Sequence, residues 1–228
     1  MSLREHSIYD CIINNARNYS DEIALVSGDL RLTYGEVPLH VNSLARGLLN
    51  TGFEKGDRIG VLLNNCAEYA LLLAACTRIG LITVCLNTRT SADEMRKMLE
   101  QAKPKALIFQ KSYEQQADEL RELHIHRQLY CIDEASILSS SFDQLLDEDP
   151  SPLNQPQPAV DDGWLIIPTA AVDGIPKGAL LSQRNVMASA DVHLHHFGRE
   201  AIKGHLVALP IFHVMGLTSA WATFISGG

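Results

Sequence analysis

The stretch Trp164-Leu-Ile-Ile-Pro-Thr-Ala-Ala-Val-Asp-Gly-Ile-Pro-Lys-Gly-Ala-Leu-Leu-Ser182 decides how the rest of the chain is interpreted. Its apolar run 164–167 predicts a buried strand, and a second apolar run, 179–181, predicts another. Glycines, prolines and Lys177 lie between the two runs. A tight loop with exposed N–H groups and one lysine suits an anion such as phosphate. A β-hairpin turn with a solvated lysine is the alternative.

Helical and strand patterns alternate along the rest of the chain. Helical periodicity or end signals predict helices over residues 7–18, 33–52, 64–78, 91–102 and 182–197, and after 216. Short apolar runs predict strands at 23–26, 30–33, 58–63, 81–86, 105–109, 128–132 and 205–209. This alternation predicts an α/β fold with parallel or mixed sheets flanked by helices.

Several polar residues are expected to cap these helices. Thr33 with Glu36, and Ser91 with Glu94, have the spacing of a capping box. Asn64 or Asn65 is expected to cap the predicted helix that ends at residue 78, and Ser182 is expected to cap the predicted helix that ends at residue 197.

Composition sets the broad class. The chain has 228 residues, of which 46% are hydrophobic and 20% charged, as expected for a globular chain with a core. Its net charge of −8 argues against a nucleic-acid partner. No apolar run is long enough to span a membrane, because Arg78 interrupts the longest one. Five cysteines without a CxxC pair predict reduced thiols and a cytoplasmic protein.

The segment 147–162 differs in composition from its surroundings. Four prolines stand among acidic and amide residues, which predicts a solvated connector before the strand at 164. We therefore expect 1–228 to form one partial domain, in which 147–162 connects two α/β segments.

The loop resembles the phosphate-binding signature T-S-G-T-T-G-x-P-K-G of adenylate-forming enzymes, the acyl-CoA synthetase (AMP-binding) superfamily. The matching residues are Thr169, Gly174, Pro176, Lys177 and Gly178, whereas Ala170 to Asp173 depart from the signature. Further pieces follow in the family's order, among them Leu32-Thr-Tyr-Gly-Glu36, Arg78-Ile-Gly80 and Leu209-Pro-Ile-Phe-His213. The resemblance covers most of the chain and implies the N-terminal part of the family's large domain.

The resemblance implies a function and a site. The family joins a carboxylic acid to ATP and passes the acyl group to coenzyme A, with Mg²⁺ offsetting the phosphate charges. The loop would hold ATP through Thr169, Asp173, Gly174, Pro176, Lys177 and Gly178, with Asp173 turned toward Mg²⁺ or solvent. Phe212 and His213 would border the acid, and His213 would be the catalytic residue. A solvated Lys177 and a packed core His213 are the alternatives.

Three further histidines, His193, His195 and His196, lie on one predicted helix. No two of them are four residues apart, so a solvated helix face is favoured over a metal site.

Two functions stay open. The first is the N-terminal fragment of an ATP-dependent acid–CoA ligase for a fatty or aryl acid, inactive alone because the family's ribose-binding Asp and C-terminal Lys do not occur. The second is a degenerate, non-catalytic member that binds an acyl group, a nucleotide or a protein partner, which the altered loop favours. We also expect apolar surface left exposed in such a fragment to promote self-association.

Overall fold

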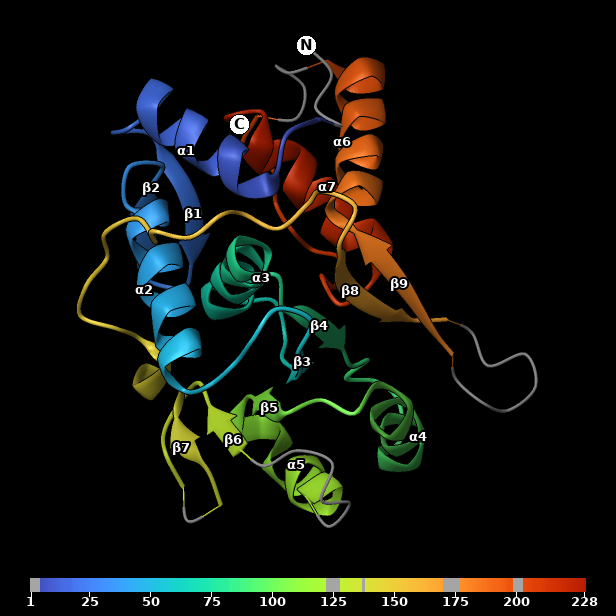
Figure 1. Ribbon diagram of the computed structural model, residues 1–228. Helices are drawn as coiled ribbons and strands as arrows, with labels where there is room; N and C mark the ends of the chain where they lie inside the picture. Colours follow the sequence, from blue (N-terminus) through green and yellow to red (C-terminus); the bar gives the residue numbers. More distant parts are fainter. Residues whose placement is uncertain (1–4, 122–127, 137, 170–176, 199–202) are drawn as a thin grey trace.

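A seven-stranded sheet forms the centre of the computed structural model, which describes residues 5–121, 128–136, 138–169, 177–198 and 203–228 (Figure 1). The strand order is β7-β6-β5-β3-β4-β8-β9, and only β9 runs antiparallel to its neighbour. The strands are β3 (Arg58–Leu62), β4 (Ile82–Cys85), β5 (Ala106–Phe109), β6 (Gln128–Cys131), β7 (Ser140–Ser141), β8 (Gly163–Pro168) and β9 (Gly178–Ser182). The predicted α/β fold is confirmed.

Helices cover both faces of this sheet (Figure 1). Helices α4 (Ala92–Ala102) and α5 (Glu114–Arg121) lie on one face, where alternate strand residues such as Leu62 and Leu107 pack against them. The other face packs on α1 (Ile8–Asn18), α2 (Val37–Asn50), α3 (Ala67–Ile79), α6 (Gln183–Phe197) and α7 (Val214–Ile225). Two 3₁₀ turns, η2 (Lys111–Tyr113) and η3 (Phe142–Leu145), lie in the connections after β5 and β7. Because both faces are buried, the central strands are mostly apolar, with Arg58 at the start of β3 and Thr83 in β4 as exceptions.

A separate hairpin, β1 (Ile23–Ser27) and β2 (Leu30–Thr33), lies outside the main sheet. Gly28 has a φ of +58° at its turn, a conformation that glycine adopts without strain. Both strands lie where the sequence predicts them.

Two predicted helix starts are confirmed and two need correction. Capping boxes form at Ser91 and Ser182, in the second case with Asn185 as the partner. Thr33 and Glu36 do exchange hydrogen bonds, but helix α2 begins only at Val37. Neither Asn64 nor Asn65 caps α3, which begins after Cys66 without a side-chain cap. Both asparagines instead bond to other segments of the chain.

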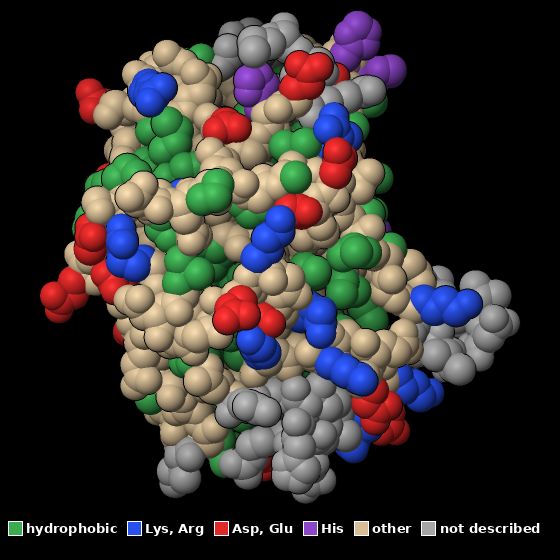
Figure 2. Space-filling model, viewed as in Figure 1, with side chains coloured by type: hydrophobic (Ala, Val, Ile, Leu, Met, Phe, Trp, Pro, Cys, Tyr) green, Lys and Arg blue, Asp and Glu red, His purple; other side chains and the backbone are tan. Residues whose placement is uncertain are grey.

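Charged side chains of both signs are interspersed on the face shown in Figure 2. None of the described helices combines the length and the apolar character needed to cross a membrane. All five cysteines are free thiols.

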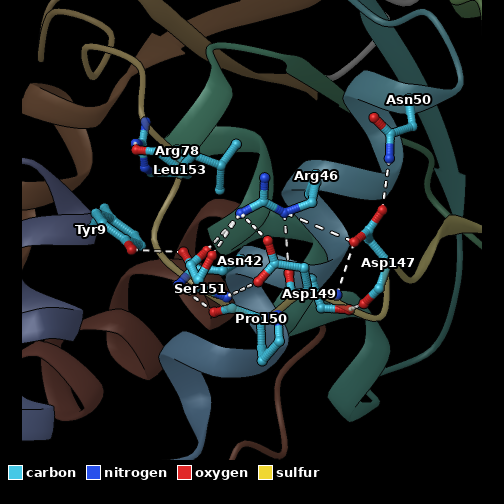
Figure 3. A network of polar contacts seen from close by, with 11 residues as sticks. Tyr9, Asn42, Arg46, Asn50, Arg78, Asp147, Asp149, Pro150, Ser151 and Leu153 are labelled. Atoms are coloured by element: carbon cyan, nitrogen blue, oxygen red, sulfur yellow. Dashed lines mark hydrogen bonds and ion pairs between the residues drawn. The ribbon is translucent and has the colours of Figure 1, made fainter.

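Residues 147–162 contain no helix or strand, but side chains of α2 and α3 fix their path (Figure 3). The Arg46 guanidinium donates to the carbonyl oxygens of Asp149 and Ser151 at 3.1 and 2.9 Å. Asn42 donates to the Pro150 carbonyl at 3.1 Å. The buried Arg78 side chain donates to the Leu153 carbonyl at 2.7 Å and lies over the Tyr9 ring, 5.1 Å from its centroid. The segment therefore follows a defined course over the two helices.

The predicted strand 205–209 is wrong. This segment forms no ladder with any strand of the described residues, and Leu206 is 85% exposed. The Asn65 side chain bonds to its backbone instead, donating to the Val207 and Leu209 carbonyls at 3.0 and 2.9 Å and accepting from Ile211 N at 2.9 Å. A strand needs a neighbouring strand for its backbone groups, and here the Asn65 side chain takes two carbonyls of this segment and the N–H of Ile211 just beyond it.

Candidate ligand site at the carboxyl edge of the sheet

The loops that follow β3, β4 and β8 emerge at the same edge of the sheet, because these strands are parallel. In open parallel sheets this carboxyl edge is where ligands bind. The sequence here turns polar, with Asn64 and Asn65 after β3, Asn87 after β4 and Thr169 after β8.

A cavity of about 340 Å³ opens at this edge, beside β4 and β8. Apolar side chains of α4 and the strand ends form part of its lining, and amide, hydroxyl and imidazole groups form the rest. The lining residues are Leu86, Asn87, Thr90, Glu94, Met95, Met98, Pro168, Thr169, Phe212 and His213. Three residues chosen from the sequence, Thr169, Phe212 and His213, thus meet in one cavity although up to 44 residues separate them.

The loop between β8 and β9 is closed at its neck by its own backbone. Thr169 N donates to the Lys177 carbonyl at 2.8 Å, and the Thr169 hydroxyl donates to the same oxygen at 3.1 Å. Asp173, Gly174 and Pro176 lie outside the described residues, so their assignment to ATP stays a prediction. Lys177 is exposed at the neck and does not line the cavity. Its phosphate role also stays a prediction.

Gly178 has a packing reason to be glycine. A Cβ atom at this position would lie 2.4 Å from Ile166 Cγ2 and 2.8 Å from Met98 Cε. Because Gly178 has no side chain, β9 can pack closely against Met98 of α4 and Ile166 of β8. Packing alone therefore accounts for a glycine at position 178. The contact of Gly178 with ATP stays a prediction.

Phe212 and His213 differ in burial although they are adjacent. Phe212 is 6% exposed and belongs to the large core. His213 is exposed and is the N-cap of α7, where its Nδ1 accepts a long hydrogen bond of 3.4 Å from Met215 N. A packed core histidine does not describe this geometry. The catalytic role is untested, but the imidazole lies where a ligand in the cavity would meet it.

Three residues that shape the site were not selected from the sequence. Met95 and Met98 line the cavity from α4, where their spacing of three residues places them on one face of the helix. Asn65, expected to be a cap, holds the segment that leads into Phe212 and His213. The helical spacing of the methionines was visible in the sequence, whereas a contact across about 145 residues leaves no local signal.

Glu94 is the acidic residue in the cavity lining, and its carboxylate is already engaged in hydrogen bonds. Glu94 accepts hydrogen bonds from Ser91 N and Oγ at 3.1 and 3.2 Å as part of the capping box of α4. Throughout the described part of the chain, no group of three or more His, Cys, Asp or Glu side chains could hold a metal ion. His195 and His196 lie in the last turn of α6.

Together, the mostly parallel sheet and the cavity at its carboxyl edge define an α/β protein with a candidate ligand site. A family model described as AMP-binding enzyme matches residues 13–228, and the chain belongs to that family. The 2-succinylbenzoate–CoA ligase of Bacillus pumilus is 28% identical over 221 residues, which cover 95% of this chain and 42% of the relative. The 4-coumarate–CoA ligase 3 of Arabidopsis thaliana is 27% identical, with 92% and 38% covered.

Solved structures agree on the fold. A protein assigned as a long-chain-fatty-acid CoA ligase from Rhodopseudomonas palustris superposes with a TM-score of 0.89 at 29% identity, covering all of this chain and 57% of the other. The N-terminal domain of FACL13 from Mycobacterium tuberculosis gives a TM-score of 0.79 at 23% identity, covering 97% and 55%. The chain thus spans about 40% of the length of the curated relatives it matches, and little more than half of these solved chains.

Proposed function

We propose that the protein is the N-terminal part of an acid–CoA ligase, which uses ATP to adenylate a fatty or aryl carboxylic acid and transfers the acyl group to coenzyme A. The cavity in which Thr169, Phe212 and His213 meet carries the proposal. In this view 1–228 is one portion of the AMP-binding domain, with 147–162 as a connector between its two α/β segments. The two curated relatives named above, both CoA ligases, support this class of reaction.

The residues of the cavity divide the proposed work by chemistry. The Met95, Met98 and Phe212 side chains offer an apolar wall for the organic part of the acid. His213, exposed at the start of α7, offers an imidazole that donates to a carboxylate or holds a proton beside it. The N-terminus of α7 adds a partial positive charge on the same side.

The neck of the loop is proposed to face phosphate. The Thr169 hydroxyl proton is donated to the Lys177 carbonyl, so in this proposal the hydroxyl turns from that carbonyl to donate to a phosphate oxygen. The Lys177 ammonium group is exposed beside it and is the proposed charge partner of the triphosphate. Mg²⁺, when bound with ATP, supplies the charge neutralisation that two anions require.

The test is MgATP binding, measured by isothermal titration calorimetry on wild type and Lys177→Ala. Loss of a charge-assisted hydrogen bond is expected to weaken binding by about 1–3 kcal/mol. Lys105→Ala is the matched control, because Lys105 precedes β5 at the opposite edge of the sheet, where it pairs with Asp57. Equal weakening in both variants would refute the assignment of Lys177.

A non-catalytic role is the second candidate, favoured by Ala170, Ala171 and Val172, which replace hydroxyl- and glycine-bearing positions of the family signature. Absence of MgATP binding by wild type would support it. MgATP binding by an Asp173→Ala variant further distinguishes the ligase function from the non-catalytic role. Tighter binding in that variant would show that the acid repels the triphosphate, whereas weaker binding would place it near Mg²⁺. We also propose that the 228 residues alone do not catalyse acid-dependent pyrophosphate–ATP exchange.

A further inference from the structure

Met98 lies at the inner end of the carboxyl-edge cavity. Helix α4 connects β4 to β5, and because both strands are parallel to β3, the helix must run back from the carboxyl edge toward the opposite edge. Each residue of an α-helix lies about 1.5 Å further along the axis than the one before it, so Met98 lies about 6 Å deeper than Glu94. Thr90 and Glu94 are therefore at the mouth of the cavity, and Met98 forms its floor.

The far side of Met98 is filled by protein. A Cβ atom on Gly178 would lie 2.8 Å from Met98 Cε and 3.5 Å from its sulfur, so the end of the side chain rests on the backbone of β9. Met98 is only 3% exposed and shares its core cluster with Val84 and Leu99. Because this core is packed, the thioether can swing into the cavity but has no room to retreat from it. The floor of the cavity is therefore fixed.

The space above this floor is small and suits a ring. Ligand pockets commonly measure about 300–1,000 Å³, and this cavity measures about 340 Å³. Its mouth is polar, with Asn87 and Thr90, so only the inner part is apolar. The thioethers of Met95 and Met98 line that part, with the Phe212 ring. Sulfur makes favourable contacts with aromatic rings, which favours an aryl group over an alkyl chain here.

The lining provides for one negative charge on the ligand. Among the described lining residues there is no lysine or arginine, and His213 is the group that can take up a positive charge. The Glu94 carboxylate at the mouth would repel a second carboxylate on the ligand. The arrangement therefore suits a monocarboxylate whose ring lies against Met98 and whose carboxylate faces His213.

We propose that Met98 sets the size limit of the acid, and that the substrate is a compact aryl monocarboxylate and not a long-chain fatty acid. Met98 is a specificity-determining residue in this view, because it contacts the ring and not the reacting carboxylate. The inference rests on the proposed function, since it takes this cavity as the acid site.

The first test needs no variant to fold differently. The 228-residue chain, labelled with ¹³C at the methionine methyl groups, is titrated with cinnamate or with dodecanoate in the absence of ATP. The ring current of cinnamate should shift the Met98 methyl signal, whereas dodecanoate at the same concentration should leave it in place. Met187 is the internal control, because it is buried in the core on the other face of the sheet and does not line the cavity. Met98→Leu assigns the signal.

The second test moves the floor in both directions, with acid binding measured by calorimetry. Met98→Ala removes the sulfur and two carbons, and dodecanoate should then bind at least about tenfold more tightly than to wild type, because about three more methylene groups are buried. Gly178→Ala should push Met98 into the cavity and weaken cinnamate binding about threefold or more. Gly163→Ala is its matched control, since its new Cβ meets the Leu180 side chain and not Met98. Thermal unfolding verifies that each variant is folded.

Three results would overturn the proposal: a Met98 methyl signal that cinnamate does not shift, an equal shift with dodecanoate, or no gain for dodecanoate in a folded Met98→Ala protein. The ligase function would survive any of them if wild type binds MgATP and Lys177→Ala weakens that binding. Acid binding at Met98 without MgATP binding would count against the ligase function alone, and the size limit set by Met98 would stand.

Discussion

The two irregular segments on either side of β8 are held in different ways. The connector 147–162, which leads into the strand, is fixed by side chains of two helices, with Asn42, Arg46 and Arg78 bonding to its carbonyls. The loop that leaves the strand is closed at its neck by Thr169 and Lys177, which bond to each other. Both segments contain turn-forming residues, four prolines and four aspartates in the connector and two glycines, one proline and one aspartate in 169–178.

This difference shows what composition leaves out. Proline, glycine and aspartate predict that a segment is neither helix nor strand. Whether its path is fixed depends on donors that reach it from elements far away in the sequence. The connector receives such donors along much of its length, and its position is set before any ligand binds. At the neck of the loop, by contrast, Gly178 packs closely against α4 because it has no side chain.

Gly47→Ala should have the largest effect on stability, because the new side chain would clash with the backbone at the start of the connector. A Cβ atom at Gly47 would lie 1.9 Å from the Leu145 carbonyl oxygen and 3.3 Å from Asp147 N, both backbone atoms. Alanine would favour the helix by about 1 kcal/mol. Overpacking against backbone should outweigh this gain and lower the free energy of unfolding by about 3 kcal/mol, which corresponds to roughly 6–12 °C in melting temperature.

Urea unfolding and calorimetry would measure this loss. His40→Ala is the control, because His40 is exposed on the same helix. A Gly47→Ala protein as stable as that control would show that the connector yields to α2, and the contrast between the two segments would not hold.

Gly178→Ala should cost less, because side chains and not backbone lie in the way. The new Cβ meets Ile166 Cγ2 and the end of Met98, whose flexible thioether can move aside. We expect a loss of about 1 kcal/mol in unfolding free energy. Gly163→Ala, at the other end of the same strand pair, meets only the Leu180 side chain, which is 57% exposed and free to turn away. If Gly163→Ala costs as much, the close approach to α4 is not the cause.

Much of the fold could be predicted from the sequence, because it rests on local signals. The capping box at Ser91, the turn at Gly28 and the left-handed Gly80 at the end of α3 each depend on a few neighbouring residues. The wrong strand at 205–209 and the misassigned Asn65 are one error with one cause. The Asn65 side chain bonds to a segment about 145 residues away. It therefore does not cap α3, and the carbonyl groups that it occupies are not available for a strand at 205–209.

The candidate site divides along the same line. The resemblance of the loop selected Thr169, and the Leu-Pro-Ile-Phe-His segment selected Phe212 and His213, and the structure brings these three together. Met95 and Met98 were missed because a methionine pair at helical spacing is equally typical of a core. Only the position of α4 beside the ends of β4 and β8 makes them part of a cavity wall.

The smallest expected effect concerns the far end of the connector and depends on pH. Asp10 stabilises the start of α1 and accepts a hydrogen bond of 2.9 Å from the connector's Gln157 side chain. Burial raises the pKa of this carboxyl group, but the hydrogen bonds from Gln157 and Ser7, with the charge of His6, more than offset it and hold the pKa below its ordinary value of 3.8. A carboxylate with a lowered pKa in the folded state contributes stability above its unfolded pKa. That contribution is lost as the pH falls through the folded pKa.

Asp10→Asn keeps the shape and removes the charge, so it isolates this contribution. At pH 7 we expect the variant to be less stable than wild type by about 0.5 kcal/mol, the scale of an exposed charge at a helix N-terminus. The difference should begin to narrow below about pH 4, where Asp10 of the unfolded wild-type chain takes up a proton, and should narrow further as the pH falls through the lower pKa of the folded state. Urea unfolding of both proteins between pH 7 and pH 3 measures it. A difference that stays constant over this range would mean that shape and not charge joins α1 to the connector, so that at this end the connector is held by neutral hydrogen bonds, as the neck of the loop is.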